Sequence, residues 1–308
     1  MVQENSLAKV VVICGPTASG KTAIAVEVAR RLGSEVISAD SMCIYKGCDI
    51  GTAKPTKEET RGIVHHMIDV VEPFDDYSVG DYKAAALPIV SGIIQRGKIP
   101  VICGGTGFYI NSILYNLSYG NSAADDGVRE YYEDYRAKYG NEKLHGLLAE
   151  KDPTTAAVLH VNDVKRVIRA LEIYDVTGKR KSEMNDEYVP VFDYSSYCVD
   201  FPREELYERI NARVDVMMKS GLIDEVKGLL ARGVSPDAQC MQGIGYKEVC
   251  RGIAEGLPES LIAEEIKFNT RHYAKRQITF FKRDERLKLL EKSDVNSLAD
   301  MIAGNYDR

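Results

Sequence analysis

The residues with the clearest chemical potential form one segment near the start of the chain: Gly15, Pro16, Thr17, Ala18, Ser19, Gly20, Lys21 and Thr22. They fit the pattern G-x-x-x-x-G-K-[ST] at every fixed position, which is the pattern of a phosphate-binding loop. Glycines let such a backbone turn several N–H groups toward an anion. We expect Lys21 to reach the phosphates as a solvent-facing point charge and the Thr22 hydroxyl to ligate Mg²⁺. The pattern predicts a site for a di- or triphosphate without specifying a nucleotide.

The residues on either side of this loop predict the elements that hold it. Residues 10–13 are a β-branched run, which is typical of a buried parallel strand. Residues 23–32 carry apolar side chains at helical spacing and are followed by Gly33 as a stop. A helix that starts at the loop adds partial positive charge to the anion site. This context favours a phosphate loop over a chance glycine-rich turn.

Two further polar side chains follow predicted strands. Asp40 comes after the strand predicted for Glu35–Ser38, and Thr106 follows the one predicted for Ile99–Cys103, in a second glycine-rich turn. The carboxyl ends of parallel strands meet at one edge of a sheet, where open α/β sheets bind ligands. Asp40 could act there as a general base or hold metal-bound water, or it could only cap a turn. Its position alone does not choose between these roles.

The order of the predicted elements indicates an α/β protein. Strands and helices alternate over residues 1–119, which predicts a P-loop NTPase-like parallel sheet with flanking helices. Residues 120–194 contain no convincing buried strand but several apolar stripes at helical spacing, so we expect an inserted all-helical domain there. A strand returns at Tyr197–Phe201, and a long helix is predicted for Glu259–Arg283. Residues 195–308 are therefore predicted to complete the core with C-terminal helices.

Two basic segments stand out in a chain whose net charge is −6. In the predicted insertion, residues 165–181 hold six Lys or Arg against two acids, and Arg166 and Arg169 share one side of a helix. In the long helix, three cations align at intervals of four residues, namely Lys267, Arg271 and Lys275. Such patches are typical of phosphate binding in nucleic acids. The alternative is that these cations are solvated or pair with nearby acids.

The composition excludes several classes of protein. The chain has 308 residues, of which 44% are hydrophobic, so it is long enough for one large domain or two. Its net acidity argues against a uniformly basic nucleic-acid binder. No apolar run reaches the roughly 18 residues of a membrane span. Seven cysteines without a C-x-x-C motif indicate reduced thiols in a cytoplasmic protein.

Eight motifs in order resemble those of the tRNA dimethylallyltransferases, also called tRNA isopentenyltransferases or the IPP transferase family, in the bacterial form. The motifs are GPTASGKT (15–22), SADSM (38–42), DIGTAKP (49–55), HHMID (65–69), GGTGFYI (104–110), RVIRALEIY (166–174), GIGYKE (243–248) and TRHYAKRQ (270–277). The resemblance implies transfer of a dimethylallyl group from dimethylallyl diphosphate to N6 of the adenosine 3′-adjacent to the anticodon in tRNA. It also implies Mg²⁺ as cofactor, the tRNA anticodon stem-loop as partner, a cytoplasmic location, no membrane, and a monomer.

The resemblance also implies roles for single residues. Asp40 would take the N6 proton, Thr106 would hydrogen-bond the same region, and Arg213 would join the phosphate loop in binding the diphosphate. The residues implied to face tRNA are Asp40, Ser41, Met42, Cys43, Arg129, Lys165, Arg166, Arg169, Gln242, Gly243, Gly245, Tyr246, Lys247, Lys267, Arg271 and Lys275. Cys43 stands where the family usually has Gln, so a group that hydrogen-bonds the base is either lost or supplied from elsewhere.

Three other functions use the same features. The first is a dimethylallyltransferase that acts on free AMP or ATP, for which the basic segments would have no purpose. The second is a small-molecule kinase or ATPase, against which the lack of a supporting metal-holding acid argues. The third is a non-catalytic RNA-binding module of NTPase-like fold.

Overall fold

The computed structural model describes residues 7–117, 125–184 and 188–306. Its internal contacts divide the chain into two units. The core unit comprises Met1–Tyr115 and Pro190–Arg308, and the helical unit comprises Asn116–Val189. The sequence predicts an insertion that spans residues 120–194, so the observed unit begins and ends a few residues earlier than predicted. Each unit is described below by itself.

The core unit is built on one six-stranded sheet with strand order β3-β2-β4-β1-β5-β6. The strands are β1 (Lys9–Cys14), β2 (Val36–Ser38), β3 (His65–His66), β4 (Val101–Gly104), β5 (Asp193–Val199) and β6 (Leu287–Leu290). Every pairing in this sheet is parallel, as the alternation of elements predicted. A parallel sheet needs apolar side chains on both faces, and β1 supplies them at full burial through Val10, Val11 and Val12.

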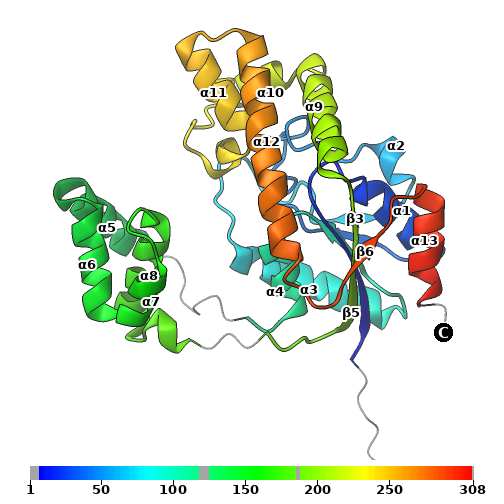
Figure 1. Cartoon of the computed structure of the whole chain (residues 1–308), viewed down its shortest axis with the longest axis horizontal. Helices are drawn as coiled ribbons and strands as arrows, with labels where there is room; N and C mark the ends of the chain where they lie inside the picture. Colours follow the sequence, from blue (N-terminus) through cyan, green and yellow to red (C-terminus); the bar gives the residue numbers. More distant parts are fainter. Residues whose placement is uncertain (1–6, 118–124, 185–187, 307–308) are drawn as a thin grey trace, which may run out of the picture. The chain divides into compact units, whose positions relative to one another are not determined.

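Helices cover both faces of the sheet (Figure 1). On one face, Val11 and Ile13 of β1 pack with α1 (Lys21–Arg31) and α13 (Val295–Gly304). On the other face, Val10 and Val12 pack with α3 (Val79–Gln95) and α4 (Gly107–Leu114). The alternation follows from the period of two in a strand, which sends successive side chains to opposite faces.

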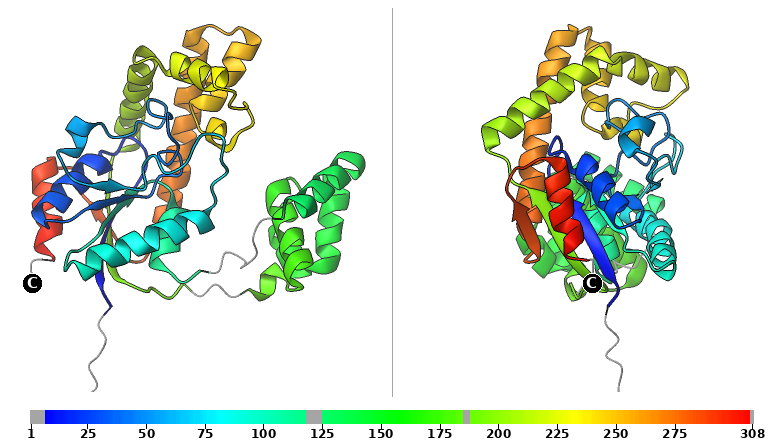
Figure 2. Two further views of the ribbon diagram at one scale, coloured as in Figure 1. Left: turned by 180° about the vertical axis from the view of Figure 1, so that it is seen from behind. Right: turned by 90° about the vertical axis from the view of Figure 1, so that its right-hand side faces the viewer.

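Most of the remaining helices of the core unit lie beyond the end of the sheet toward which β1 runs, and the longest of them extends from there back beside the sheet until it contacts α4 (Figures 1 and 2). These remaining helices are α2 (Lys57–Thr60), α9 (Arg203–Lys219), α10 (Leu222–Ala231), the 3₁₀ helix η2 (Gln239–Gln242), α11 (Tyr246–Glu255) and α12 (Glu259–Phe281). α9 and α12 contact each other along their length. They thus stand next to the carboxyl ends of the strands, where the sequence predicted the chemistry.

The helical unit contains α5 (Asp126–Tyr139), α6 (Asn141–Lys151), α7 (Pro153–Val158), α8 (Val164–Thr177) and the 3₁₀ turn η1 (Lys181–Glu183). No strand occurs in its described residues, so the prediction of an all-helical insertion is confirmed there. Its small core contains buried residues of each of these α-helices, namely Tyr132 of α5, Leu144 and Leu148 of α6, Ala156 of α7, and Val167, Ile168, Ala170 and Leu171 of α8.

Where the helical unit joins the core unit, two segments of the core lie side by side. Tyr115, the residue after α4, forms an antiparallel bridge with Pro190. The N–H of Val191 donates to the carbonyl of Leu114 at 2.9 Å. The hydroxyls of Tyr115 and Tyr194 are 2.5 Å apart, which ties the same residue to β5.

The strand prediction for Tyr197–Phe201 was wrong in its bounds, because β5 covers Asp193–Val199. Its first half carries Ser195 and Ser196, whose polarity hides a strand that is in fact buried between β1 and β6. β6 and α13 were not predicted. β6 is a short edge strand with exposed positions, so its sequence lacks the apolar run of a central strand.

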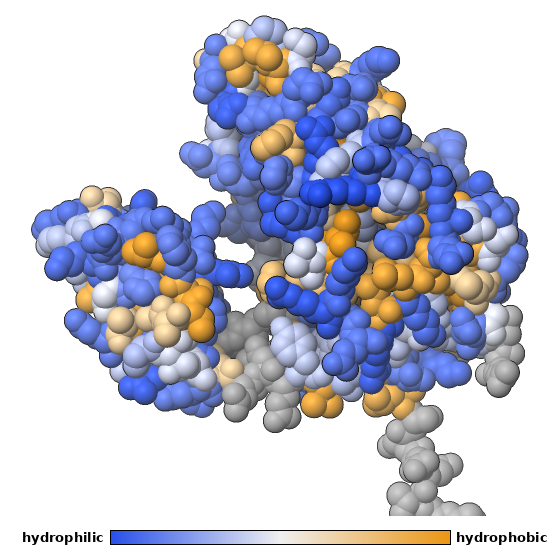
Figure 3. Space-filling model, in the orientation of Figure 1, coloured by the Kyte–Doolittle hydropathy of each residue, from blue (hydrophilic) through white to orange (hydrophobic). Residues whose placement is uncertain are grey.

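No helix within the described ranges is both long and apolar enough to cross a membrane. On the face shown in Figure 3, hydrophobic residues form small areas among hydrophilic ones.

Candidate active site

The phosphate-loop segment connects β1 to α1 in the predicted order of strand, loop and helix. Two of its glycines have positive φ angles, 134° at Gly15 and 79° at Gly20, which other residues rarely adopt. A Cβ at Gly15 would lie 2.7 Å from Cys198 Sγ of β5, so the loop also needs glycine there for space. The Arg209 guanidinium supports the loop from α9 by donating to the carbonyl of Ala18 at 2.8 Å.

Lys21 and Arg213 bring two desolvated positive charges to this loop. Lys21 is half-buried rather than solvent-facing, which corrects that expectation, and its Nζ donates to the carbonyl of Pro16 at 3.2 Å. Burial lowers the pKa of both side chains, and the nearby Asp40 carboxylate opposes that shift. Within the described part of the chain neither cation forms an ion pair with an acid. Two buried charges without such partners form a site that an anionic ligand would stabilise.

Asp40 and Thr106 are brought together at the carboxyl ends of β2 and β4. Asp40 Oδ1 accepts the N–H groups of Met42 at 2.9 Å and Cys43 at 3.3 Å. Thr106 Oγ1 accepts the N–H of Ser41 at 3.1 Å. Among the described residues nothing hydrogen-bonds the second oxygen of Asp40. Asp40 therefore caps a turn with one oxygen and keeps the other available for proton transfer.

The phosphate loop and Asp40 share one cavity of about 380 Å³ within the core unit. Members of the predicted site that line it are Thr17, Lys21, Thr22, Asp40, Ser41, Met42, Cys43, Arg213, Gln242, Gly243, Tyr246 and Lys247. A second cavity, of about 860 Å³, is also lined by residues of the same loop, namely Ala18, Gly20, Lys21 and Thr22. The residues that line both are Lys21, Thr22, Ala53, Pro55, Arg213 and Met217. The two cavities therefore adjoin at the phosphate loop.

One wall of the 380 Å³ cavity comes from α12 and was missed as a part of the site. Thr270, Tyr273 and Gln277 line the cavity at intervals of three and four, so they share one face of the helix. Burial raises the pKa of the Tyr273 hydroxyl to about 12, so it stays a neutral donor. The helical spacing within TRHYAKRQ was a signal that could have identified these residues, but the basic residues between them directed the interpretation to a tRNA-binding patch on this helix.

Another part of the cavity wall, which includes Gly51 and Tyr246, is held in place by Glu225 of α10. Its carboxylate accepts the N–H groups of Asp49, Ile50 and Gly51 at 2.7–3.1 Å and the hydroxyl of Tyr246 at 2.6 Å. A Cβ at Gly51 would lie 2.5 Å from the Tyr246 ring, so these segments are in direct contact. Tyr246 is fully buried and acts as a structural wall, and Gly245 is the buried residue before α11.

Cys43 is buried in the cavity wall, although the resemblance places it against tRNA. Burial raises the pKa of its thiol far above the usual value, so the group is a neutral thiol. A thiol is a weak hydrogen-bond donor compared with the amide of Gln. The departure from the family pattern therefore replaces an amide by a largely apolar contact.

The basic residues of the helical unit differ in how far they are engaged. Arg129 and Arg169 both pair with the carboxylate of Glu172, at 2.9 and 2.7 Å, and Glu172 is fully buried. Lys165 is exposed, and Arg166 is 67% exposed with only a 4.0 Å contact to Asp163. Lys165 and Arg166 are therefore better placed than Arg129 and Arg169 to contact the phosphates of a nucleic acid.

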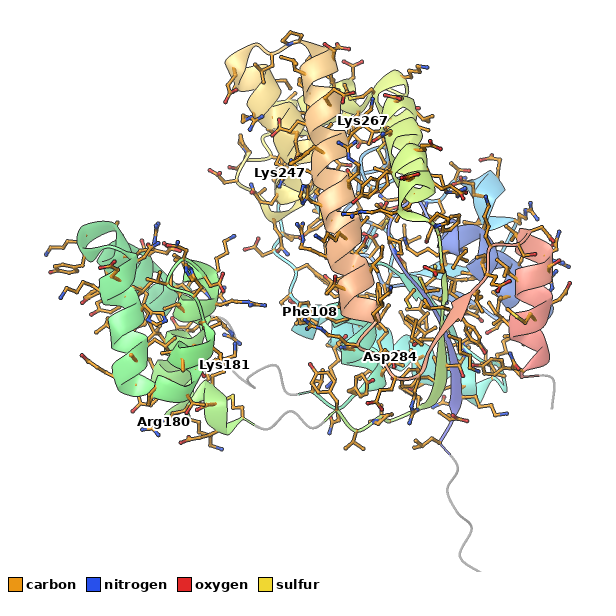
Figure 4. The ribbon with its side chains drawn as sticks, in the orientation of Figure 1. Phe108, Arg180, Lys181, Lys247, Lys267 and Asp284 are labelled. Carbon is orange, nitrogen blue, oxygen red and sulfur yellow. The ribbon has the colours of Figure 1, made fainter. Side chains whose placement is uncertain are left out.

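The basic residues of α12 also differ. Lys267 is 13% exposed and pairs with Asp215 at 2.7 Å and Glu264 at 2.9 Å, between α12 and α9 (Figure 4). Arg271 donates to the side chain of Asn211 at 2.6 Å. Lys275 is exposed. Two of the three aligned cations are thus already engaged in the core unit, which makes Lys275 the better candidate for a tRNA contact.

A parallel sheet whose first strand ends in a phosphate loop, with that loop opening into a cavity that also holds a carboxylate, defines a P-loop α/β protein. A family model described as IPP transferase matches residues 43–284, and one described as isopentenyl transferase matches residues 8–71. The chain belongs to the IPP transferase family, which confirms the resemblance read from its motifs.

Individual relatives agree with this assignment. The tRNA dimethylallyltransferase of Pelotomaculum thermopropionicum is 44% identical over 98% of both chains. The solved full-length tRNA isopentenylpyrophosphate transferase from Bacillus halodurans is 40% identical, with a TM-score of 0.71 over 96% of each chain. A solved eukaryotic dimethylallyltransferase acting on tRNA is 30% identical, with a TM-score of 0.81 over 97% of this chain and 77% of that one.

Proposed function

We propose that this enzyme transfers a dimethylallyl group from dimethylallyl diphosphate to N6 of the adenosine 3′-adjacent to the anticodon in tRNA. The observation that carries the proposal is the pair of desolvated cations, Lys21 and Arg213, in the same cavity as Asp40. The names of the relatives, which specify a dimethylallyl donor and tRNA, support the same reaction.

The reaction needs two kinds of assistance that this cavity offers. The bond from the allylic carbon to the diphosphate oxygen breaks, and a bond from that carbon to adenine N6 forms. Lys21, Arg213 and the loop amides stabilise the negative charge that develops on the leaving diphosphate. The free oxygen of Asp40 accepts the N6 proton, for which general base assistance is typically about 10²–10⁴-fold. Thr106 holds the Asp40 turn through the N–H of Ser41 and so helps to position this proton acceptor.

The adenosine must leave its stack to reach Asp40. Extrusion of a base costs a few kcal/mol and is cheaper in a loop than in a helix. The two cavities that adjoin at the phosphate loop provide space for the donor and for the extruded base. We place Gln242, Gly243 and Lys247 at the tRNA side, because they line the cavity at its edge between η2 and α11.

The residues at the loop also fit a magnesium ion. Thr22 lines both cavities, and the buried Ser19 Oγ has no hydrogen-bond partner among the described atoms. No group of three His, Cys, Asp or Glu residues suited to a metal occurs in the described segments. Mg²⁺ commonly binds one or two protein oxygens and completes its shell with phosphates and water, so Thr22 with a diphosphate suffices. Such an ion would supply further charge stabilisation for the leaving group.

The contact with tRNA is proposed to use local basic patches of a net acidic protein. Lys165 and Arg166 in the helical unit and Lys275 in the core unit are exposed and suited to phosphate contacts. We further propose that the enzyme acts as a monomer in the cytoplasm. The free-nucleotide alternative is not favoured by the relatives, which are named for tRNA.

The test is mass spectrometry of tRNA after incubation with the enzyme, Mg²⁺ and dimethylallyl diphosphate. We expect one adenosine next to the anticodon to gain the mass of one C5 prenyl unit, with release of diphosphate. Parallel reactions with AMP and with an anticodon stem-loop test the alternative substrate. Product from AMP but not from the stem-loop would contradict the proposal, as would the absence of any prenylated nucleoside.

A further inference from the structure

A single buried side chain, Gln277 of α12, joins the phosphate loop to the glycine-rich turn after β4. Its Oε1 accepts the N–H of Thr17 at 2.9 Å, and its Nε2 donates to the carbonyl of Gly105 at 2.9 Å. Gln277 is 5% exposed. The Thr17 N–H is therefore already engaged and is not among the loop amides available to the diphosphate.

The fit between these three segments is tight. A Cβ at Gly105 would lie 2.2 Å from the Gln277 amide nitrogen and 3.5 Å from the carbonyl oxygen of Gly15. Only glycine leaves room for the amide between the two loops. An amide also suits the position, because it offers one acceptor and one donor at the end of a single side chain.

The turn that Gln277 holds continues directly to the proposed proton acceptor. The N–H of Thr106 donates to the carbonyl of Ala39 at 3.0 Å, and Thr106 Oγ1 accepts the N–H of Ser41 at 3.1 Å. These bonds fix the segment on either side of Asp40. A hydrogen-bonded path thus runs from the phosphate loop through Gln277 to the Asp40 turn.

In the described parts of the chain this is the one hydrogen-bonded connection between the two loops apart from the pairing of β1 with β4. That pairing ends at Cys14 and Gly104, before either loop begins its turn. Beyond the strands, Gln277 therefore supplies the direct hydrogen-bonded link between the two loops, while Arg209 supports the phosphate loop separately from α9.

We infer that Gln277 is a positioning residue that sets the separation between the diphosphate and the proton acceptor. The inference rests on the proposed function. A displacement needs the allylic carbon between its leaving group and N6, and a misplacement of about 1 Å can cost about 10²-fold in rate. Gln277 contacts neither reacting atom and acts through the two loops.

The experiment compares Gln277→Met with Gln277→Glu. Met matches the length of Gln and removes both hydrogen bonds, whereas Glu keeps the acceptor for Thr17 and loses the donor to Gly105. With both substrates bound at saturation, we expect the single-turnover rate of Gln277→Met to fall about 10²-fold. The dissociation constants for dimethylallyl diphosphate and for tRNA should change by less than about 3-fold. Gln277→Glu should lie between this variant and wild type.

Gln239, an exposed residue of η2, offers a control with the same pattern of hydrogen bonds. The Gln239 side-chain amide accepts the N–H of Tyr77 and donates to the Tyr77 carbonyl, both at 2.9 Å. Gln239 does not line the 380 Å³ cavity. Gln239→Met should therefore leave the single-turnover rate unchanged. Gly105→Ala should lower the single-turnover rate to the same extent as Gln277→Met. The double variant should be no slower than either single one, because both break the same connection.

The outcomes separate this inference from the proposed function. If wild type makes no prenylated tRNA, the proposed function fails. If wild type is active and both Gln277 variants keep a wild-type single-turnover rate, the inference is overturned. The inference is also overturned if kcat/KM falls only because dimethylallyl diphosphate binds more weakly, while the single-turnover rate at saturation stays at the wild-type value. Should Gln277→Met fail to fold, Gln277→Glu and Gly105→Ala carry the same comparison.

Discussion

At the scale of single residues, the site combines unsatisfied charge with restrained geometry. Lys21 and Arg213 are cations that burial disfavours, and the chain supplies no acid in contact with either among its described residues. Asp40 is restrained by two backbone N–H groups on one oxygen only. Such residues lower the folding stability of the protein while the site is empty, and binding of an anion restores that stability. This pattern is common at functional sites.

Replacing Lys21 tests the anion site. We expect Lys21→Met to lower kcat/KM for dimethylallyl diphosphate by about 10²–10³-fold, the usual effect of losing one group that stabilises developing charge. Because burial lowers the Lys21 pKa in the folded state, folding disfavours its charged form, and that cost is fully present below the folded pKa. The melting temperature of Lys21→Met near pH 7 should therefore match or exceed that of wild type. Lys219→Met, at the exposed end of α9, is the control. Near-normal kcat/KM in Lys21→Met would refute the loop assignment.

Asp40→Asn separates the two roles of this carboxylate. Asn keeps an oxygen that can accept the N–H groups of Met42 and Cys43, so the turn should fold and tRNA affinity should stay close to wild type. Loss of the proton acceptor should slow the single-turnover rate by about 10²–10⁴-fold. The comparison requires the rate and the tRNA dissociation constant on the same preparation. A rate equal to wild type would leave Asp40 with only its capping role.

At the scale of elements, the sequence predicts a helix or strand most accurately where its apolar residues recur at regular spacing and where glycines or polar residues mark its ends. The run at residues 10–13 and the loop glycines were sufficient for β1, the phosphate loop and α1. β5 was misplaced because Ser195 and Ser196 interrupt its apolar pattern. The buried face of α12 was missed because its polar side chains are satisfied only by loops far away in sequence, as Gln277 is by Thr17 and Gly105. Such pairings leave no local signature.

The helical unit contains an element whose stability depends on one carboxylate. Asp152 is buried and caps α7 by accepting from Thr155 and from the N–H of Ser182. Burial alone would raise its pKa, but these hydrogen bonds outweigh it and lower the pKa to about 2. Because the folded pKa is depressed, the stabilisation is complete above the unfolded pKa and is lost as pH falls toward the folded value.

We therefore expect Asp152→Ala to destabilise the helical unit by about 1–2 kcal/mol, the usual cost of a lost cap. Hydrogen exchange of α7 and α6 amides should report the loss, while amides of β1 should be unaffected. The difference from wild type should be the same at about pH 5 and about pH 7, since Asp152 is ionised in both states at either pH. A difference that disappears at pH 5 would contradict this account of the cap.

At the scale of the whole molecule, binding of an anionic tRNA by a net acidic chain must depend on where its cations are unpaired. The structure divides the predicted basic residues into exposed ones, Lys165, Arg166 and Lys275, and engaged ones, Arg169 and Lys267. Exposed cations can release counterions when they meet phosphates, whereas a cation already paired with an acid gains less. Charge count along the sequence does not make this distinction.

A salt titration of tRNA affinity tests the division. Lys165→Ala/Arg166→Ala should weaken binding and reduce the log–log salt slope by roughly 0.7–0.9 for each lost phosphate contact. Lys267→Ala should leave the slope unchanged, because its charge is neutralised by Asp215 and Glu264. Affinity for dimethylallyl diphosphate should stay the same in both. Equal slopes in wild type and the Lys165/Arg166 variant would exclude this patch as a tRNA contact.

The bridge between Tyr115 and Pro190 has a consequence for how such a protein can change over evolutionary time. A chain that leaves and re-enters a domain at one point can lengthen there without rerouting any strand or separating any pair in the sheet. The entropy cost of a longer excursion grows only with the logarithm of its length. The connection between α4 and β5 can therefore vary in length without a change in the order or pairing of the strands. Homologous chains are then free to differ at this point in size and charge while the phosphate loop and its partner residues stay in register.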